Sequence, residues 1–143
     1  MYVRTGLIAL LLSLGVMLAG CPGNHDHGPA NAAQGGLRLD DGRKWQADDH
    51  TRASAARMRD AISSADASTV EAARALGSRL QKELDELIRG CTMTGAAHDQ
   101  LHVFLGRLMP AVDSLAKAAD VAAAEKALAS VRELLETYDR HFE

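Results

Sequence analysis

The chain has 143 residues, with 16 basic and 19 acidic side chains and a formal net charge of −3. The basic residues form no cluster, so the concentrated positive surface that binds nucleic acid is not expected. Apolar residues make up 47% of the sequence, and the length fits one small folded domain.

The first 20 residues have the composition of an export signal. One positive charge, Arg4, precedes an apolar run from Gly6 to Ala19 that ends in small residues. This run is too short for a stable membrane span and has the organisation of a secretory signal peptide. Residues 1–20 are therefore predicted to be a cleaved leader.

The end of this leader, Leu18-Ala19-Gly20-Cys21, resembles the lipobox of bacterial lipoproteins. The resemblance implies that Cys21 is diacylated and that the leader is cut just before it. It places the protein in the bacterial cell envelope, facing the periplasm and held on the membrane by lipid. Two or three acyl chains provide a stable anchor without a spanning helix. Pro22, rather than an aspartate, follows the cysteine, which by the same resemblance favours the outer membrane.

Residues 21–44 are predicted to form the lipidated N-terminus and a flexible tether, and residues 45–143 the folded domain. The first part of the tether is rich in Gly, Pro, Asn and Ala and has no apolar period. Within it, His25 and His27 flank Asp26. This spacing suits weak binding of a divalent metal, but the surrounding composition favours a plain polar linker.

Four amphipathic helices are predicted from the 3-4 spacing of apolar residues. Their expected ranges are 48–64, 68–89, 96–118 and 121–142. Short connections between helices of similar length favour antiparallel neighbours. The predicted fold is therefore all-α, an up-down-up-down antiparallel four-helix bundle.

Local signals mark the ends of these helices. Asp48 or Asp49 is expected to cap the first helix, and Ser68 to open a capping box at the start of the second. Gly90 is a natural stop for the second helix. Pro110 removes a backbone donor inside the third helix, where a kink is expected.

This topology gathers the unusual side chains at one end of the bundle. That end holds the start of the first helix, the loop after the second, the start of the third and the end of the fourth. The histidines of the domain are expected there, namely His50, His98, His102 and His141. So are its aromatic residues, Trp45, Phe104, Tyr138 and Phe142. Any chemistry is expected at this end.

The segment CTMTGAAHDQLH (91–102) supplies candidate metal ligands. His98 and His102 lie four residues apart, a spacing at which two imidazoles on one helix face can share a metal ion. Both are expected on the buried stripe of their helix, facing Cys91, with Met93 as a further ligand. Thiolate, thioether and imidazole together favour copper(I) or zinc. The predicted metal site is therefore Cys91, His98, His102 and Met93.

Simpler explanations exist for each of these residues. A histidine at a bundle end is often satisfied by a backbone carbonyl or by a carboxylate such as Asp99 or Glu136. Cys91 has no intrachain partner once Cys21 carries lipid, and a lone thiol can be a small buried hydrophobe or can pair two molecules. Thr92 or Thr94 could cap the third helix. His50 and His141 are expected to be surface histidines.

Other classes of function remain open. A metal-free adaptor would dock an envelope protein on the bundle surface. A haem b site would use Met58 or Met109 with His102, whereas c-type haem is not expected because no C-x-x-C-H is present. Cys91 and His98 could act as nucleophile and base. No third orienting residue accompanies them, so an enzyme is not predicted.

The pattern CTM-x-G-x-AHD-x-LH, together with DDGRKW at 40–45, resembles a segment of small exported helical proteins of bacteria. This resemblance implies no activity. The sequence as a whole predicts a lipid-anchored four-helix bundle that binds copper or zinc for sequestration or handover.

Overall fold

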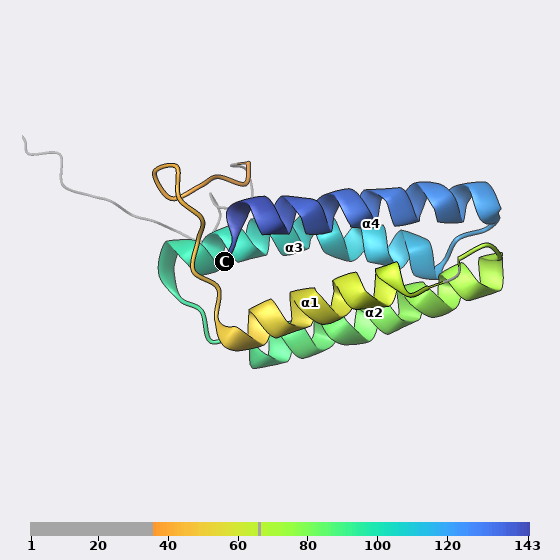
Figure 1. Ribbon diagram of the computed structural model, residues 1–143, viewed down its shortest axis with the longest axis horizontal. Helices are drawn as coiled ribbons and strands as arrows, with labels where there is room; N and C mark the ends of the chain where they lie inside the picture. The colour runs from red at the N-terminus through yellow and green to blue at the C-terminus, as the bar shows by residue number, and fades with distance from the viewer. Residues whose placement is uncertain (1–35, 66) are drawn as a thin grey trace, which may run out of the picture.

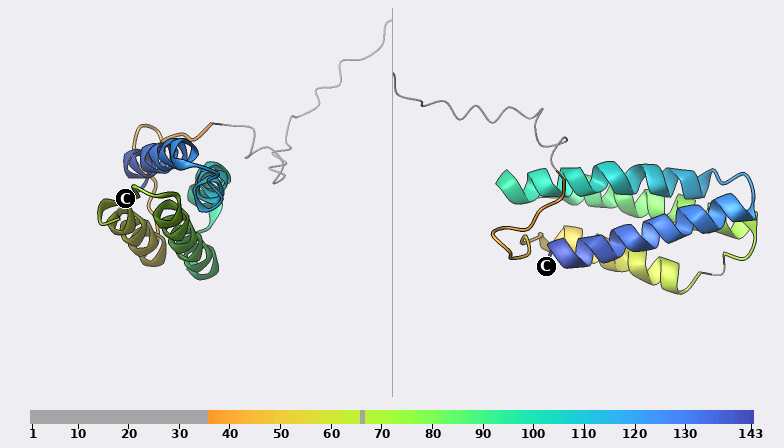
Figure 2. Two further views of the ribbon diagram at one scale, coloured as in Figure 1. Left: turned by 90° about the vertical axis from the view of Figure 1, so that its right-hand side faces the viewer. Right: turned by 90° about the horizontal axis from the view of Figure 1, so that it is seen from above.

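The computed structural model describes residues 36–65 and 67–143, which form four antiparallel helices (Figure 1). Helix α1 spans Asp49–Ser63, α2 Val70–Gly90, α3 Gly95–Ala116 and α4 Val121–His141. The end-on view places the helices at the corners of a four-sided bundle (Figure 2). The predicted all-α four-helix bundle is confirmed.

Three of the helices begin with a side-chain cap. Asp48, Thr69 and Asp120 precede α1, α2 and α4, and each accepts a hydrogen bond from the backbone N–H three residues further on, at 2.7, 3.2 and 2.8 Å. Such a bond satisfies one of the amides that have no partner within the helix. The cap of α2 is thus Thr69, one residue beyond the predicted Ser68.

The core is a continuous apolar column between the helices. Its largest fully buried side chains are Phe104, Met58, Leu80, Leu87, Leu101, Leu108 and Leu115. Burial of each such side chain stabilises the fold by about 1.5–3 kcal/mol. Helix α3 continues through Pro110 to Ala116 and contributes the inward stripe Leu101, Leu105, Leu108, Val112 and Leu115.

Residues 36–47, called the strap below, cross one end of the bundle before α1 begins (Figure 1). The backbone N–H of Arg38 donates to Oε1 of Gln100 on α3 at 2.7 Å, and Nε1 of Trp45 donates to the Arg38 carbonyl at 2.6 Å. The side chains of Leu37 and Trp45 pack against the core. Residues 37–44, assigned to the tether by composition, are therefore fastened to the bundle.

The strap also pairs with the C-terminal residues. Trp45 N–H donates to the His141 carbonyl at 2.8 Å, Glu143 N–H to the Trp45 carbonyl at 2.9 Å and Ala47 N–H to the Glu143 carbonyl at 2.8 Å. The result is an isolated parallel bridge between Trp45 and Phe142. The end of the bundle that these contacts close, where α1 and α3 start and α2 and α4 finish, is called the strap end.

The predicted leader, residues 1–20, lies outside the described part of the chain, as do three residues of the predicted tether to which the sequence assigned roles. They are Cys21, expected to carry lipid, and the tether histidines His25 and His27. Within residues 36–65 and 67–143, none of the helices combines the length and the apolar character needed to cross a bilayer.

Candidate functional site

The connection between α2 and α3, residues 91–94, forms one wall of the strap end. Cys91 leaves α2 in an extended conformation, with φ −65° and ψ 124°. Gly95 opens α3 at φ +64°, a left-handed conformation that glycine adopts without steric cost. Thr94 stands at the N-cap position of α3 but makes no side-chain capping bond. The loop must therefore be held in place from elsewhere.

Asp48 holds this loop from the first turn of α1. Its Oδ1 accepts the capping bond from Thr51 N–H, and its Oδ2 accepts from both Thr92 N–H at 2.5 Å and Thr92 Oγ1 at 2.8 Å. Burial alone would raise the pKa of the Asp48 carboxyl. The hydrogen bonds from Thr92 and Thr51 outweigh it and hold that pKa well below its usual range. Asp48 is therefore a carboxylate at neutral pH, with both oxygens occupied.

His98 lies in the first turn of α3 and is oriented by the same loop. Its Nδ1 is 2.7 Å from the carbonyl oxygen of Met93. Because a carbonyl only accepts, Nδ1 must carry the proton in this contact. In the neutral ring, Nε2 then has a free lone pair, which is the form of imidazole that binds a metal.

His102 stands one turn further along α3 with its ring beside that of His98. The two Nε2 atoms are 2.6 Å apart and the ring centroids 4.4 Å apart. Since Nε2 of His98 is the acceptor, the N–H between the rings belongs to His102. The structure therefore brings together two of the predicted ligands, with their Nε2 atoms aimed at one another.

The expectation that both histidines lie on the buried stripe is wrong for His102. His98 is half-buried, whereas His102 is exposed. At about 100° per residue, His98 lies about 60° and His102 about 100° around the helix from Leu101, the first residue of the buried stripe. The pair therefore sits at the edge of the α3 core face, open to solvent on the His102 side.

The sulfur ligands of the predicted site are placed differently. Cys91 is half-buried and its Sγ lies 4.0 Å from Nδ1 of His98, the nitrogen that already donates to Met93. Met93 is 9% exposed, and its side chain belongs to the hydrophobic core. In this conformation, therefore, neither Cys91 nor Met93 is placed to share a metal ion with the Nε2 atoms of the two histidines.

Among residues 36–65 and 67–143, no group of three or more His, Cys, Asp or Glu side chains is arranged to hold a metal ion. The arrangement that the structure does provide is a pair of imidazole nitrogens near the surface, on His98 and His102. Met58 and Met109, considered as haem ligands with His102, are respectively fully buried and 46% exposed.

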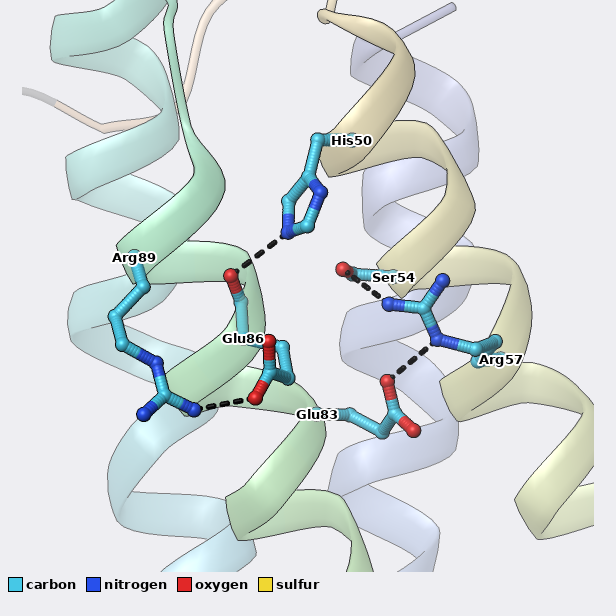
Figure 3. A network of polar contacts seen from close by, with 6 residues as sticks. All are labelled: His50, Ser54, Arg57, Glu83, Glu86 and Arg89. Atoms are coloured by element: carbon cyan, nitrogen blue, oxygen red, sulfur yellow. Dashed lines mark hydrogen bonds and ion pairs between the residues drawn. The ribbon is translucent and has the colours of Figure 1, made fainter.

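The other two histidines of the domain bond to helix carbonyls. Nε2 of His50 lies 2.8 Å from the Glu86 carbonyl in the last turn of α2, beside the Arg57–Glu83 ion pair that links α1 to α2 (Figure 3). Nδ1 of His141 lies 2.8 Å from the Thr137 carbonyl of its own helix. Both were predicted to be surface histidines, and both are half-buried at the edge of the bundle.

An aromatic cluster forms the floor beneath the strap. Phe104 and Tyr138 have ring centroids 5.4 Å apart, and Tyr138 stacks on Phe142 at 5.0 Å. Trp45 joins Phe142 through the backbone bridge described above. The predicted gathering of aromatic residues at this end is therefore confirmed.

Two residues of the site had no functional signal in the sequence. Asp48 was expected only as a helix cap, because its contact with Thr92 spans 44 residues and follows no period. Gln100 is 6% exposed and receives the strap on the side of α3 about 160° around the helix from the two histidines. A polar residue inside the apolar face of a helix was the only local indication of that role.

Searches of protein-family models, of curated proteins and of solved structures gave no match to this chain, so the assignment of function depends on the geometry of the site.

Proposed function

We propose that this protein is a lipid-anchored protein of the bacterial envelope that binds copper or zinc at the strap end, for sequestration or handover of the ion. The supporting observation is the His98–His102 pair, whose Nε2 atoms face each other at 2.6 Å while Nδ1 of His98 donates to the Met93 carbonyl. A metal-binding histidine commonly donates its second nitrogen to a carbonyl in this way, which fixes the ring and its tautomer.

Two adjustments would let the pair share an ion. Nε2 of His102 carries the proton between the rings, so this ring must first take the tautomer protonated at Nδ1, which its exposed position allows by exchange with solvent. Two imidazole nitrogens at about 2.0–2.1 Å from a tetrahedral zinc ion are about 3.3 Å apart. The observed separation is 2.6 Å, so the two rings must open by about 0.7 Å. His102 is exposed, and its side chain can make this movement without disturbing the core.

Cys91 is the candidate for a third ligand. Its sulfur lies 4.0 Å from the His98 ring but on the Nδ1 side, so it reaches a shared ion only after the Cys91 or His98 side chain rotates. Copper(I) and zinc both accept thiolate together with imidazole. A site with two imidazole ligands and one movable thiolate leaves a coordination position open to an acceptor, which suits handover better than permanent storage.

Metal titration of the unlipidated chain from Pro22 onward tests this proposal. The background carries His25→Ala and His27→Ala, so that the tether histidines do not contribute. We expect Cu(I) or Zn(II) to bind more tightly than about 10⁻⁵ M, as measured by competition with a chelator. His98→Ala and His102→Ala should each weaken binding at least about tenfold, and Cys91→Ser should weaken it less.

His50→Ala is the matched control, because His50 lies at the same end of the bundle but bonds to Glu86 on α2. It should leave the affinity unchanged. Binding weaker than about 10⁻⁵ M in the parent chain would remove metal binding from the proposal, and so would His98→Ala and His102→Ala variants that bind as tightly as the parent.

The anchor is tested separately by metabolic labelling with a radioactive fatty acid in a bacterial host. The support for it is the segment Leu18 to Cys21, which resembles a lipobox. The full chain should incorporate label and sediment with membranes, and Cys21→Ser should do neither. Cys91→Ser should be labelled like the parent chain, and label that persists in Cys21→Ser would contradict the assignment.

A further inference from the structure

We infer that Asp48 is a positioning residue for the histidine pair, which fixes the tautomer of His98 by holding Thr92 and, through it, the Met93 carbonyl. The effect of Asp48 on metal affinity rests on the proposed function. Its effect on the His98 tautomer concerns the metal-free protein alone. It assigns a role to Oδ2 of Asp48, the carboxylate oxygen that does not cap α1.

The two oxygens of Asp48 serve two different elements. Oδ1 accepts from Thr51 N–H and caps α1, while Oδ2 accepts from the backbone and side chain of Thr92. A helix cap needs only one acceptor. The second oxygen therefore connects α1 to the loop that precedes α3, 44 residues away in the sequence.

The loop transmits this contact directly to His98. Thr92 and Met93 are adjacent, so the peptide plane that bears the Met93 carbonyl begins one residue from the Asp48 contact. The Met93 side chain is buried in the core, which fixes the residue from the other side. With both constraints in place, the carbonyl is held 2.7 Å from Nδ1 of His98.

Loss of the Asp48–Thr92 contact should release this orientation. Thr94 makes no side-chain capping bond, so no hydroxyl at the N-cap of α3 can substitute for Asp48. If the Met93 carbonyl moves away, either nitrogen of His98 can carry the proton. A fraction of the molecules would then present a protonated Nε2 toward His102, and that nitrogen does not bind a metal until it loses its proton.

Asp48→Asn separates the two tasks of the carboxylate. Asparagine is as good a helix cap as aspartate, and its amide oxygen can still accept from Thr51 N–H. Its NH₂ group is a donor and cannot accept from Thr92 N–H. Asp120→Asn is the matched control, because Asp120 caps α4 at the opposite end of the bundle through one oxygen, at 2.8 Å from Ala123 N.

The first measurement is the ¹⁵N chemical shifts of the His98 ring in the metal-free protein above pH 8. In the parent chain and in Asp120→Asn, Nδ1 should have the shift of a protonated nitrogen and Nε2 that of an unprotonated one. In Asp48→Asn the two shifts should move toward each other as the tautomers mix. Thr92→Val, which removes only the hydroxyl donor, should give a smaller change in the same direction, and it tests the inference even if Asp48→Asn does not fold.

The second measurement is metal affinity, which should fall about 10- to 100-fold in Asp48→Asn and stay unchanged in Asp120→Asn. Unaltered His98 shifts in folded Asp48→Asn, or equal changes in the two asparagine variants, would overturn the inference. If the parent chain binds no metal while Asp48→Asn still mixes the tautomers, the positioning role stands and the proposed metal function fails.

Discussion

Tyr138 carries a hydroxyl group that the fold buries without an acceptor among the described residues. Tyr138 is 3% exposed, and its ring stacks on Phe142 and meets the Phe104 ring at a tilt of 57°. Burial raises the pKa of Tyr138 to about 12 from its ordinary value of 10.0, although the nearby guanidinium groups of Arg59 and Arg52 lower it in part. At this position the packing of the ring stabilises the fold, whereas burial of the unpaired hydroxyl costs desolvation free energy.

Tyr138→Phe should therefore leave the free energy of unfolding at pH 8 unchanged or raise it by up to about 1 kcal/mol. The two proteins should differ more at high pH. Between about pH 10 and pH 12 the unfolded parent chain releases the phenolic proton and the folded chain retains it, so the stability of the parent falls as pH rises. The variant lacks this component of the decline.

Urea unfolding of both proteins at pH 8 and pH 11 measures the effect, because other groups that titrate are common to both. A loss of more than about 1 kcal/mol in Tyr138→Phe at pH 8 would show that the hydroxyl has an important partner in solution.

At the scale of the helices, apolar periodicity predicted most of the fold. The expected ranges 48–64, 68–89, 96–118 and 121–142 differ from the observed helices by no more than two residues at any end. Each helix buries a regular stripe of side chains, so its local pattern carries the information. Periodicity was less informative for the site. His102 lies at the edge of the buried stripe of α3, where a side chain can be buried or exposed, and the apolar pattern does not distinguish the two.

The contacts that orient the site could not be predicted from any local pattern. Asp48 meets Thr92 across 44 residues, and the strap reaches Gln100 from Arg38 across 62 residues. Neither pair follows a helical period. Such contacts depend on where the helix ends lie in the folded bundle, and a local sequence pattern does not give those positions.

Helix α2 packs closely against the end of α3 at Gly77. Replacing this glycine with alanine is therefore expected to destabilise the protein, although helix propensity alone would predict the opposite. A Cβ atom on Gly77 would lie 2.4 Å from the backbone nitrogen of Ala116, whereas one on Gly106 would meet no atom within 4 Å. Gly77→Ala should lower the free energy of unfolding by about 1–3 kcal/mol, because backbone atoms must move apart. Gly106→Ala should raise it by about 0.5–1 kcal/mol, as expected for an open helix interior.

Thermal or urea unfolding of the two single variants tests this pair. Both substitutions replace glycine with alanine inside a helix. Opposite changes in the free energy of unfolding would therefore reflect the close approach of α2 and α3 at Gly77. Equal effects in the two variants would mean that the helices separate at Gly77 without cost.

For the whole molecule, the two ends of the bundle are built differently. The strap end holds the four histidines of the described chain, the aromatic cluster, and hydrogen bonds between segments far apart in the sequence. The opposite end is closed by small residues, with Gly77 against Ala116 and the Arg74 side chain donating to the Ala118 carbonyl at 2.7 Å. The histidine and aromatic side chains of the described residues, which can bind or orient a ligand, are thus concentrated at one end.

The pairing of the strap with Glu143 also has a practical consequence for experiments on this protein. Any sequence fused after Glu143 leaves the bundle at the strap end, where Glu143 N–H and its carbonyl are already bonded to Trp45 and Ala47. A polyhistidine purification tag there would both strain this pairing and present competing imidazoles near His98 and His102.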